Sequence, residues 1–491
     1  MTRLFLLGGC VMGLTIVGLG PGDGRYLTRE AWQILTEAQA LYLRTSYHPA
    51  VADLPDTIQT HSFDAVYETA DSFAAVYNEI VSTLLQKVQT EDIVYAVPGH
   101  PHVGESTVTR LVTAAAELGL AVRVVSGLSF VEPSLTAVNV DALDGLQLYD
   151  AIELAQYHYP PINPDTPLLL GQVYSRLLAG ELKMALTAVY PDEHSVILIH
   201  AAGTAVEIIE PIPLYEIDRS PHINHLTSLF VPPLPYPSSL TTLAETVAHL
   251  RSPEGCPWDQ EQTPQSMRSG LQEEASEVLD ALDANNYDGL CEELGDMFYH
   301  LVMQAQMAAE METFNLSDVL AGIEAKLKRR HPHVWGDWDV ADSEHVVRNW
   351  EMLKQGEKPK KQASILDNVP KSLPALAQSQ KIQAKVKQVG FDWAEISGVY
   401  DKLDEELAEL RNAETIEEQA EELGDLLFVV TNVAKWLGID AESALRVANS
   451  KFSHRFRAVE QLALQRGVDM TQMDLAQLDV LWQEVKAASV S

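Results

Sequence analysis

The stretch that decides the fold of the C-terminal half is residues 270–302, which read GLQEEASEVLDALDANNYDGLCEELGDMFYHLV. Its apolar residues recur at the spacing of one helix face, first in Leu271, Ala275, Val278 and Leu282 and then in Leu290, Leu294, Met297 and Leu301. The segment between the two stripes, residues 285–289 (NNYDG), has the composition of a turn. The stretch therefore predicts two amphipathic helices that form a hairpin.

A second copy of this pattern follows later in the chain. The matched pairs are 270–282 with 402–413 (KLDEELAELRNA), 291–302 with 420–431 (AEELGDLLFVVT), 326–334 (KLKRRHPHV) with 451–459 (KFSHRFRAV), and 350–354 (WEMLK) with 482–486 (WQEVK). The four motifs keep the same order at nearly constant offset, which predicts two copies of one helical domain.

Each copy carries two pairs of acidic residues three positions apart. These eight candidate metal ligands are Glu274, Glu277, Glu293 and Asp296 in the first copy and Glu406, Glu409, Glu422 and Asp425 in the second. This spacing puts both acids of a pair on one helix face, beside the apolar stripe. Four carboxylates held close together repel unless a cation neutralises them, and oxygen ligands suit Mg²⁺ or Mn²⁺. One-ion and two-ion arrangements both fit.

Two ordinary explanations compete with a metal site: a solvated acidic helix face and a structural network of ion pairs. Few Lys or Arg residues lie within these segments to pair the acids, and the repetition favours the metal site. Such ions hold a triphosphate, polarise its phosphorus and activate a water. Glu273 and Glu405, each next to a predicted ligand, are the candidate general bases.

Cations and a tryptophan follow the acids in each copy. The candidate substrate-binding residues are Lys326, Arg330 and Trp350 in the first copy and Lys451, Arg455 and Trp482 in the second. Each Lys–Arg pair is four residues apart, so one helix face can present both side chains to phosphate oxygens. Such pairs also occur on solvent-facing helices, and each Trp fits either stacking on a base or core packing.

The composition limits the class of protein. The formal net charge is −36, which opposes binding to a nucleic-acid backbone, and no uninterrupted apolar run is long enough to span a membrane. Three cysteines, Cys10, Cys256 and Cys291, are too few for a disulfide framework and indicate a reducing, cytoplasmic location.

The N-terminal half alternates short apolar strands with helices, which predicts an α/β domain. Three strands are each followed by a glycine-bearing loop: 17–23 (VGLGPGD), 98–104 (PGHPHVG) and 126–129 (SGLS). Loops at the carboxyl ends of strands predict a ligand crevice, although ordinary tight turns have the same composition. The candidate cofactor-binding residues are Gly18, Gly20, Pro21, Gly22, Gly99, His100, Val103 and Ser129.

The expected organisation has four parts. These are an α/β domain over 12–220, a Pro-rich linker over 221–240, a first helical domain over 241–357 and a second over 364–491. The linker is inferred from proline density, which opposes both helix and central strand. The first ten residues (MTRLFLLGGC) have features of a lipoprotein signal, but a globular strand follows at once. We therefore expect Met12 to be the true start.

Residues 240–491 resemble the MazG family of all-α nucleoside triphosphate pyrophosphohydrolases. Besides the acidic pairs, the resemblance includes 255–259 (GCPWD), 367–375 (DNVPKSLPA), 390–393 (GFDW) and the closing Trp482. It implies a dimeric, Mg²⁺-dependent enzyme that releases pyrophosphate from many NTPs and dNTPs. The implied metal ligands lie in the second copy, with Lys451, Arg455 and Trp482 near the nucleotide. The first copy keeps the matching acids.

Residues 14–210 resemble the tetrapyrrole (corrin/porphyrin) methylases through VGLGPGD (17–23), YAVPGHPHVGE (95–105) and the 126–129 loop. The resemblance implies that S-adenosylmethionine binds between two α/β lobes. His100 stands where active methylases usually have Asp, which puts methyl transfer in question.

Three hypotheses of function follow. The leading one is hydrolysis of the α–β phosphoanhydride of nucleoside triphosphates, carried out by a homodimer formed through the helical domains. The second is a tetrapyrrole-type methyltransferase whose helical half serves dimerisation. The third is a non-enzymatic sensor of S-adenosylmethionine fused to the hydrolase.

Overall fold

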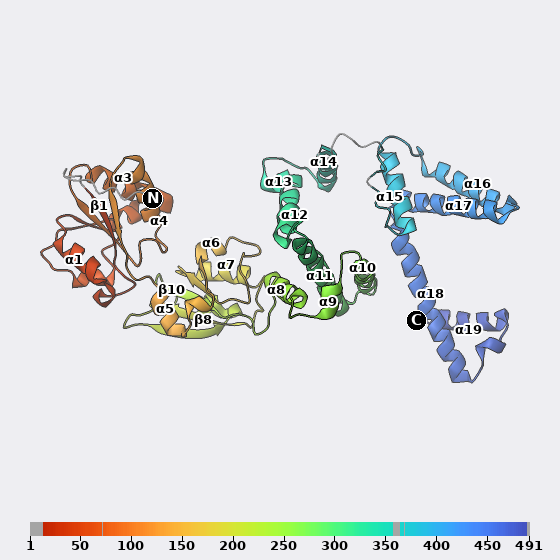
Figure 1. Ribbon diagram of the computed structural model, residues 1–491, viewed down its shortest axis with the longest axis horizontal. Coiled ribbons are helices and arrows are strands. Elements are labelled where there is room, and N and C mark those ends of the chain that lie inside the picture. The colour runs from red at the N-terminus through yellow and green to blue at the C-terminus, as the bar shows by residue number, and fades with distance from the viewer. Residues whose placement is uncertain (1–12, 71, 357–363, 368, 489–491) are drawn as a thin grey trace. The chain divides into compact units, whose positions relative to one another are not determined.

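The computed structural model describes residues 13–70, 72–356, 364–367 and 369–488 (Figure 1). The residues with features of a lipoprotein signal and the expected start at Met12 lie outside the described residues. The described chain forms two compact units, and the division along the chain falls between Gln262 and Thr263. The first unit contains two β-sheets with helices, and the second is helical throughout, as the sequence predicts. Among the described helices, none is both long enough and apolar enough to cross a bilayer.

The first sheet is parallel and has the strand order β3-β2-β4-β1-β5. Its strands are β1 (Leu14–Gly18), β2 (Leu41–Leu43), β3 (Thr60–Ser62), β4 (Ile93–Val97) and β5 (Val122–Val125). The helices α1 (Arg29–Glu37), α3 (Phe73–Lys87) and α4 (Ser106–Glu117) supply apolar residues to its two core clusters. The interior strand β1, between β4 and β5, is almost wholly buried, as is usual for parallel strands covered on both faces.

The second sheet is mixed and has the strand order β6-β7-β10-β8-β9. Its strands are β6 (Gln147–Asp150), β7 (Leu168–Gly171), β8 (Ser195–His200), β9 (Ile208–Pro213) and β10 (Thr227–Val231). Helix α7 (Arg176–Leu186) packs its buried face, including Leu178 and Leu182, into the core beneath this sheet.

The predicted linker over 221–240 is wrong in its first half. Residues Thr227–Val231 form β10, which lies between β7 and β8 and is buried along its whole length. The prolines do not oppose this strand because Pro221 and Pro232 flank it, while Pro211 and Pro213 lie in β9 at the sheet edge, where a missing N–H is tolerated. The apolar run TSLFV carries the strand signal that the proline density concealed.

The chain between the sheets and the helical half is fastened to the first unit. Asp165 accepts hydrogen bonds from the backbone N–H groups of Ser238 (2.8 Å) and Ser239 (3.1 Å) and from the hydroxyl of Thr242. Ser239 in turn caps α8 (Leu240–Arg251), which is followed by α9 (Pro257–Glu261). Both helices precede Gln262 and therefore belong to the first unit.

The two predicted helical hairpins are present in the second unit. They are α10 (Arg268–Asp283) with α11 (Tyr287–Glu310), and α16 (Ile396–Asn412) with α17 (Ile416–Trp436). Asn286 caps the start of α11, and Thr415 with Glu418 forms a capping box at the start of α17. These caps set the point at which each second helix begins, and therefore which acids face the preceding helix.

The remaining helices of the second unit are α12 (Leu316–Arg330), α13 (Pro332–Trp335), α14 (Ser343–Gly356), α15 (Ala375–Lys387), α18 (Ala441–Arg466) and α19 (Leu475–Ala488). Helices α18 and α19 pack against each other around Val459, Ala463 and Leu481.

Candidate metal centres and the glycine crevice

The first acidic cluster lies between α10 and α11. Glu274 and Glu277 come from α10 and Glu293 from α11, and one carboxylate oxygen from each lies within 4.8 Å of the others. The fourth predicted ligand, Asp296, lies one turn further along α11 and outside this group. Helical periodicity explains why Glu274 and Glu277 lie together, whereas Glu293 joins them through the packing of α11 against α10.

The second acidic cluster repeats this arrangement between α16 and α17. Glu406, Glu409 and Glu422 each offer an oxygen within 4.8 Å of the other two, and Asp425 again lies outside the group. Glu406 is only 4% exposed, so its charge sits at the interface between the two helices. A buried carboxylate needs a compensating partner, because an unpaired charge there is costly.

In both clusters, the negative charges of the acids shift the pKa of a neighbouring acid. The pKa of Glu293 is raised, first by desolvation and then by the negative charge of Glu277. The pKa of Glu422 is raised in the same way, by desolvation and by the charges of Glu409 and Glu406. Like charges held this close favour either a proton or a cation, and three converging carboxylates are the oxygen-rich set that Mg²⁺ or Mn²⁺ binds. The donor set thus fits the predicted ion.

The candidate general bases lie outside these groups. Glu405 is 55% exposed and pairs with Lys402 at 2.9 Å, while Glu273 is exposed on α10. The same Lys402 pairs with Glu406 at 2.8 Å. The hydrogen bonds that Lys402 donates to Glu406 and Glu405 raise the pKa of Lys402, so this side chain is a firmly charged ammonium beside the second cluster. Its place on the helix, four residues before Glu406, was a readable signal that the sequence analysis missed.

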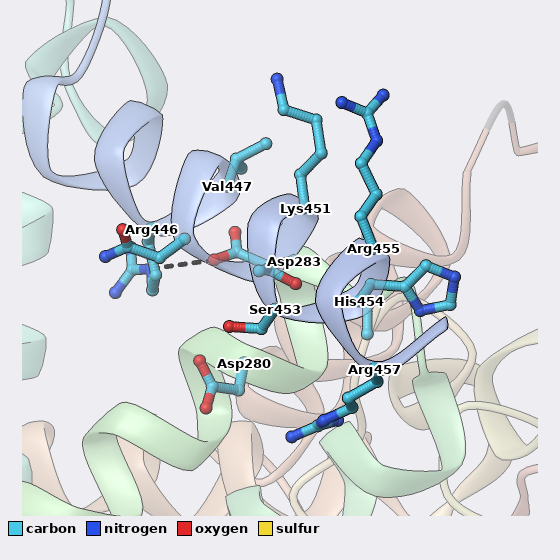
Figure 2. A pocket seen from close by; sticks show the side chains of 12 residues that line it. Asp280, Asp283, Arg446, Val447, Lys451, Ser453, His454, Arg455 and Arg457 are labelled. Carbon is cyan, nitrogen blue, oxygen red and sulfur yellow. Dashed lines mark hydrogen bonds and ion pairs between the residues drawn. The ribbon is translucent and has the colours of Figure 1, made fainter. Parts of the chain in front are cut away.

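Lys451 and Arg455 extend side by side from one face of α18, as their spacing predicts (Figure 2). They line a cavity of about 890 Å³ together with Asp280 and Asp283 of α10, and Arg446 pairs with Asp283 at 2.8 Å. Within the described part of the chain, neither Lys451 nor Arg455 is paired with an acid of its own copy. The structure therefore confirms the common helix face and leaves the phosphate contact a prediction.

The first-copy counterparts sit around a tryptophan. The guanidinium of Arg330 lies 5.5 Å from the ring centre of Trp350, and the ammonium of Lys354 lies 4.8 Å from the same ring centre. Both cations therefore make cation–π contacts with Trp350. Lys326 is partly buried on α12. In the second copy, Trp482 packs against the α18–α19 core, with its ring 5.1 Å from that of Phe452. The Trp482 ring therefore packs against the core, and its contact with a nucleotide stays a prediction.

The three predicted glycine loops meet at the carboxyl ends of β1, β4 and β5. Gly20 and Gly99 form a bridge through two backbone hydrogen bonds of 3.2 and 2.8 Å. A Cβ atom on Gly18 would lie 2.5 Å from the carbonyl oxygen of Gly99 and 2.8 Å from the backbone nitrogen of Gly127. Only a residue without a side chain allows this approach, so the glycines explain how closely the loops meet, while a ligand crevice there stays a prediction.

The other cofactor candidates surround this meeting point. His100 accepts a hydrogen bond from the backbone of His102 through Nδ1 (3.0 Å), and Val103 donates to the carbonyl of His100. The buried Ser129 donates to Glu132 at 2.7 Å. Pro21 and Gly22 lie in the bend after β1, where a Cβ on Gly22 would approach Thr204 at 3.3 Å.

A pocket of about 220 Å³ lies beside the second loop. Its lining comprises His102, Val103, Gly104, Phe130, Leu148, Tyr149, Asp150, Gly171 and Gln172. Only Val103 of the predicted residues takes part. The missed residues come largely from β6, β7 and the turn after β7, and no local sequence signal marks them, because the second sheet brings them to the loop only through the tertiary fold. Desolvation raises the pKa of Asp150 in this lining.

Three family models match the chain. They are the Tetrapyrrole (Corrin/Porphyrin) Methylases over residues 13–218, the MazG nucleotide pyrophosphohydrolase domain over 262–335, and Phosphoribosyl-ATP pyrophosphohydrolase over 377–451. The matches follow the α/β region, the first acidic hairpin and the second acidic hairpin.

Relatives cover the whole chain or its helical half. The uncharacterised protein YabN of Bacillus subtilis (strain 168) is 39% identical over 488 residues, which is 96% of this chain and 98% of the relative. The nucleoside triphosphate pyrophosphohydrolase of Escherichia coli (strain K12) is 44% identical over 260 residues, 52% of this chain and 99% of the relative. The MazG protein of Thermotoga maritima is 41% identical over 244 residues, covering 50% of this chain and 94% of the relative.

Proposed function

Because this chain belongs to the MazG family of nucleotide pyrophosphohydrolases and carries a tetrapyrrole methylase domain ahead of its helical copies, we propose that it hydrolyses nucleoside triphosphates to monophosphates and pyrophosphate with Mg²⁺. The observation that carries this proposal is the convergence of three carboxylates in each copy, Glu274, Glu277 and Glu293 in the first and Glu406, Glu409 and Glu422 in the second.

The residues in and around each cluster have different roles. When bound, a divalent cation supplies Lewis-acid stabilisation and neutralises phosphate charge. Glu406, Glu409 and Glu422 fix where the triphosphate is held, while Lys402 limits their mutual repulsion. Lys451 and Arg455 project from one helix face and are suited to stabilising the leaving pyrophosphate. Glu405 and Glu273 remain our candidates for accepting the proton of the attacking water.

A homodimer through the helical domains is part of this proposal. The acidic helices carry large apolar side chains that stay exposed within the described chain, among them Phe298 (52%), Leu301 (51%) and Leu427 (48%). Apolar surface on both hairpins is the kind that a second copy of the chain covers. Analytical ultracentrifugation of the full chain should therefore report a dimer.

The test of the hydrolase proposal is pyrophosphate release from a panel of NTPs and dNTPs, with and without Mg²⁺. The double variant Glu274→Gln with Glu406→Gln should lower the rate by about 100-fold or more, since disturbing even the outer partners of metal ligands costs 10–100-fold. The control is Glu417→Gln, an exposed acid of α17 outside the cluster. Undiminished release in the double variant would mean that the chemistry lies elsewhere.

The glycine crevice supports a second activity in the N-terminal domain. We propose that Gly18, Gly20, Gly99 and neighbouring residues bind S-adenosylmethionine, because the three loops meet beside a pocket. Calorimetry with S-adenosylmethionine tests binding, and transfer of radiolabelled methyl to a tetrapyrrole tests methylation. Binding without transfer would favour the sensor role, in line with His100 at the usual Asp position.

A further inference from the structure

The loop that precedes the second acidic hairpin exposes two aromatic side chains. It comprises residues 390–393 (GFDW), between α15 and α16, and the same four residues line a pocket of about 240 Å³. Phe391 is 78% exposed and Trp393 is 40% exposed. Aromatic rings stabilise a fold most when they are buried, so two exposed rings in one short loop indicate a surface that a ligand covers.

The backbone of this loop is held in place although its rings are exposed. Gly390 adopts the left-handed conformation (φ 84°) after α15, and the N–H of Phe391 donates to the carbonyl of Val386 at 3.1 Å. Asp392, between the two aromatic residues, is paired with Lys435 of α17 at 2.9 Å. A loop fixed in this way is preorganised for binding, because little conformational entropy remains to be lost when a ligand arrives.

The ring of Trp393 lies against the first turn of α16. A Cβ atom on Gly398 would lie 2.5 Å from Cδ1 of this ring, so the glycine makes room for the indole. Lys402 follows Gly398 by four residues, and Glu409 follows Lys402 by seven, which are the spacings of one helix face. The indole, Lys402 and Glu409 therefore occupy the same face of α16.

The separation along this face is comparable to the length of a nucleotide. Gly398 and Glu406 are eight residues apart, which is about 12 Å along the helix axis. Lys402 lies midway between them, and its ammonium is 2.8 Å from Glu406. A nucleoside triphosphate that extends along α16 from the second acidic cluster therefore brings its base to Trp393.

We propose that Trp393 and Phe391 form the stacking surface for the nucleobase of the triphosphate bound at the second acidic cluster. This inference rests on the proposed function, because it assigns the position of the base within the same site. Stacking favours no particular base, since every base has a π-face. Asp392, the charged residue of the pocket lining, is already bonded to Lys435 and does not read the edge of the base. The surface therefore accepts both purine and pyrimidine nucleotides.

The experiment measures binding to the full chain after Glu274→Gln and Glu277→Gln have disabled the first cluster. With Mg²⁺, the two probes are a nucleoside triphosphate that has a methylene group in place of the α–β bridging oxygen, and inorganic tripolyphosphate, which has no base. Calorimetry gives the Kd of each. Trp393→Ala should raise the Kd of the nucleotide about 10-fold and leave the Kd of tripolyphosphate unchanged, because only the nucleotide loses a stacking contact.

Three further variants separate stacking from a general effect on the fold. Gly398→Ala keeps the tryptophan but displaces its ring, so it should weaken nucleotide binding as Trp393→Ala does. Trp393→Phe keeps an aromatic face and should retain most of the affinity. Tyr400→Ala is the matched control, because Tyr400 is 43% exposed and lies two residues after Gly398, on the opposite side of α16. Both Kd values should stay unchanged in this control.

Several results would overturn the proposal. These are an unchanged nucleotide Kd in folded Trp393→Ala, an equal loss of affinity for both probes, no nucleotide binding with the first cluster disabled, and a change from dimer to monomer in Trp393→Ala, which would assign the surface to a second copy of the chain. If Trp393→Ala does not fold, Phe391→Ala at the more exposed position decides by the same comparison.

Pyrophosphate release is measured separately with hydrolysable NTPs. Stacking on Trp393 can fail while hydrolysis stands, and nucleotide binding can depend on Trp393 in a protein that releases no pyrophosphate. The two proposals therefore fail by different results.

Discussion

Lys435 and Asp392 form a nearly buried ion pair, with Nζ 2.9 Å from Oδ2 and side chains only 11% and 8% exposed. Asp392 also accepts from Nε1 of Trp436 at 3.3 Å, which ties the GFDW loop to the end of α17. Burial by itself raises the pKa of Asp392, but the hydrogen bond and charge of Lys435 outweigh it and the net shift is downward.

This pair predicts a stability loss in Asp392→Asn. Removing the carboxylate leaves the Lys435 ammonium with no matching charge, and breaking such pairs costs about 3 kcal/mol. Urea unfolding of the full chain, followed by tryptophan fluorescence, measures the loss. Asp401→Asn, an exposed change on α16, is the control and should alter stability by less than about 0.5 kcal/mol.

The same pair sets a pH dependence of known sign. Because the folded pKa of Asp392 lies below its unfolded value, the pair stabilises the fold above the ordinary Asp range and loses this effect as pH falls through the depressed pKa. The gap between wild type and Asp392→Asn should therefore be full at pH 7 and close at strongly acidic pH. A gap that stays constant across this range would contradict the ion-pair account.

Glu422 predicts the opposite pH behaviour in the metal-free protein. Its pKa is raised by desolvation and by Glu409, so the folded state binds a proton more tightly than the unfolded state. This group contributes a stabilising protonation at low pH that is lost as pH rises through the raised pKa. In EDTA, Glu422→Gln should therefore raise the Tm at pH 7.5, because the neutral amide relieves the repulsion between like charges.

Added Mg²⁺ should make the Tm of the wild type higher than the Tm of Glu422→Gln, which reverses the order expected in EDTA. The cation stabilises the wild type by binding the folded cluster, and the variant lacks one of the three oxygen ligands. Differential scanning calorimetry with a Mg²⁺ titration at pH 7.5 measures the crossover. An equal rise in Tm for both proteins would show that the ion does not bind Glu422.

Gly18→Ala should disrupt the crevice without affecting the helical copies. The new Cβ would meet the Gly99 carbonyl at 2.5 Å, so the loops must separate at a cost of about 1–3 kcal/mol. Calorimetric binding of S-adenosylmethionine should be lost while pyrophosphate release is kept. Gly180→Ala in α7, where the nearest contact is Asp218 at 3.8 Å, is the matched control and should leave binding intact.

Two substitutions of Trp482 distinguish a role in core packing from a contact with the nucleotide. Trp482→Phe keeps an aromatic ring against Phe452 and should preserve both stability and pyrophosphate release, whereas Trp482→Ala should destabilise the α18–α19 pair by about 2–4 kcal/mol. Parallel measurements of Tm and of KM for the nucleotide decide the case. A large rise in KM for Trp482→Phe at unchanged Tm would assign the ring to the substrate.

The sequence by itself determined the features that depend on local spacing. Acids three residues apart must share a helix face, so the common faces of Glu274 with Glu277 and of Glu406 with Glu409 follow from the sequence alone. Glycines after apolar strands likewise indicated that the three loops meet, because parallel strands deliver their carboxyl ends to one edge. Lys402 could have been found by the same reasoning.

Only the tertiary structure decided the features that join distant segments. Strand β10 lies in a proline-rich window, and its place between β7 and β8 depends on hydrogen bonds to residues far along the chain. Asp150 and Gln172 reach the pocket through the second sheet. His300 looks like one more residue of a helical stripe until α10 brings Gly270 beneath its ring. Local periodicity fixes which face a side chain occupies, whereas packing between elements fixes what that side chain meets.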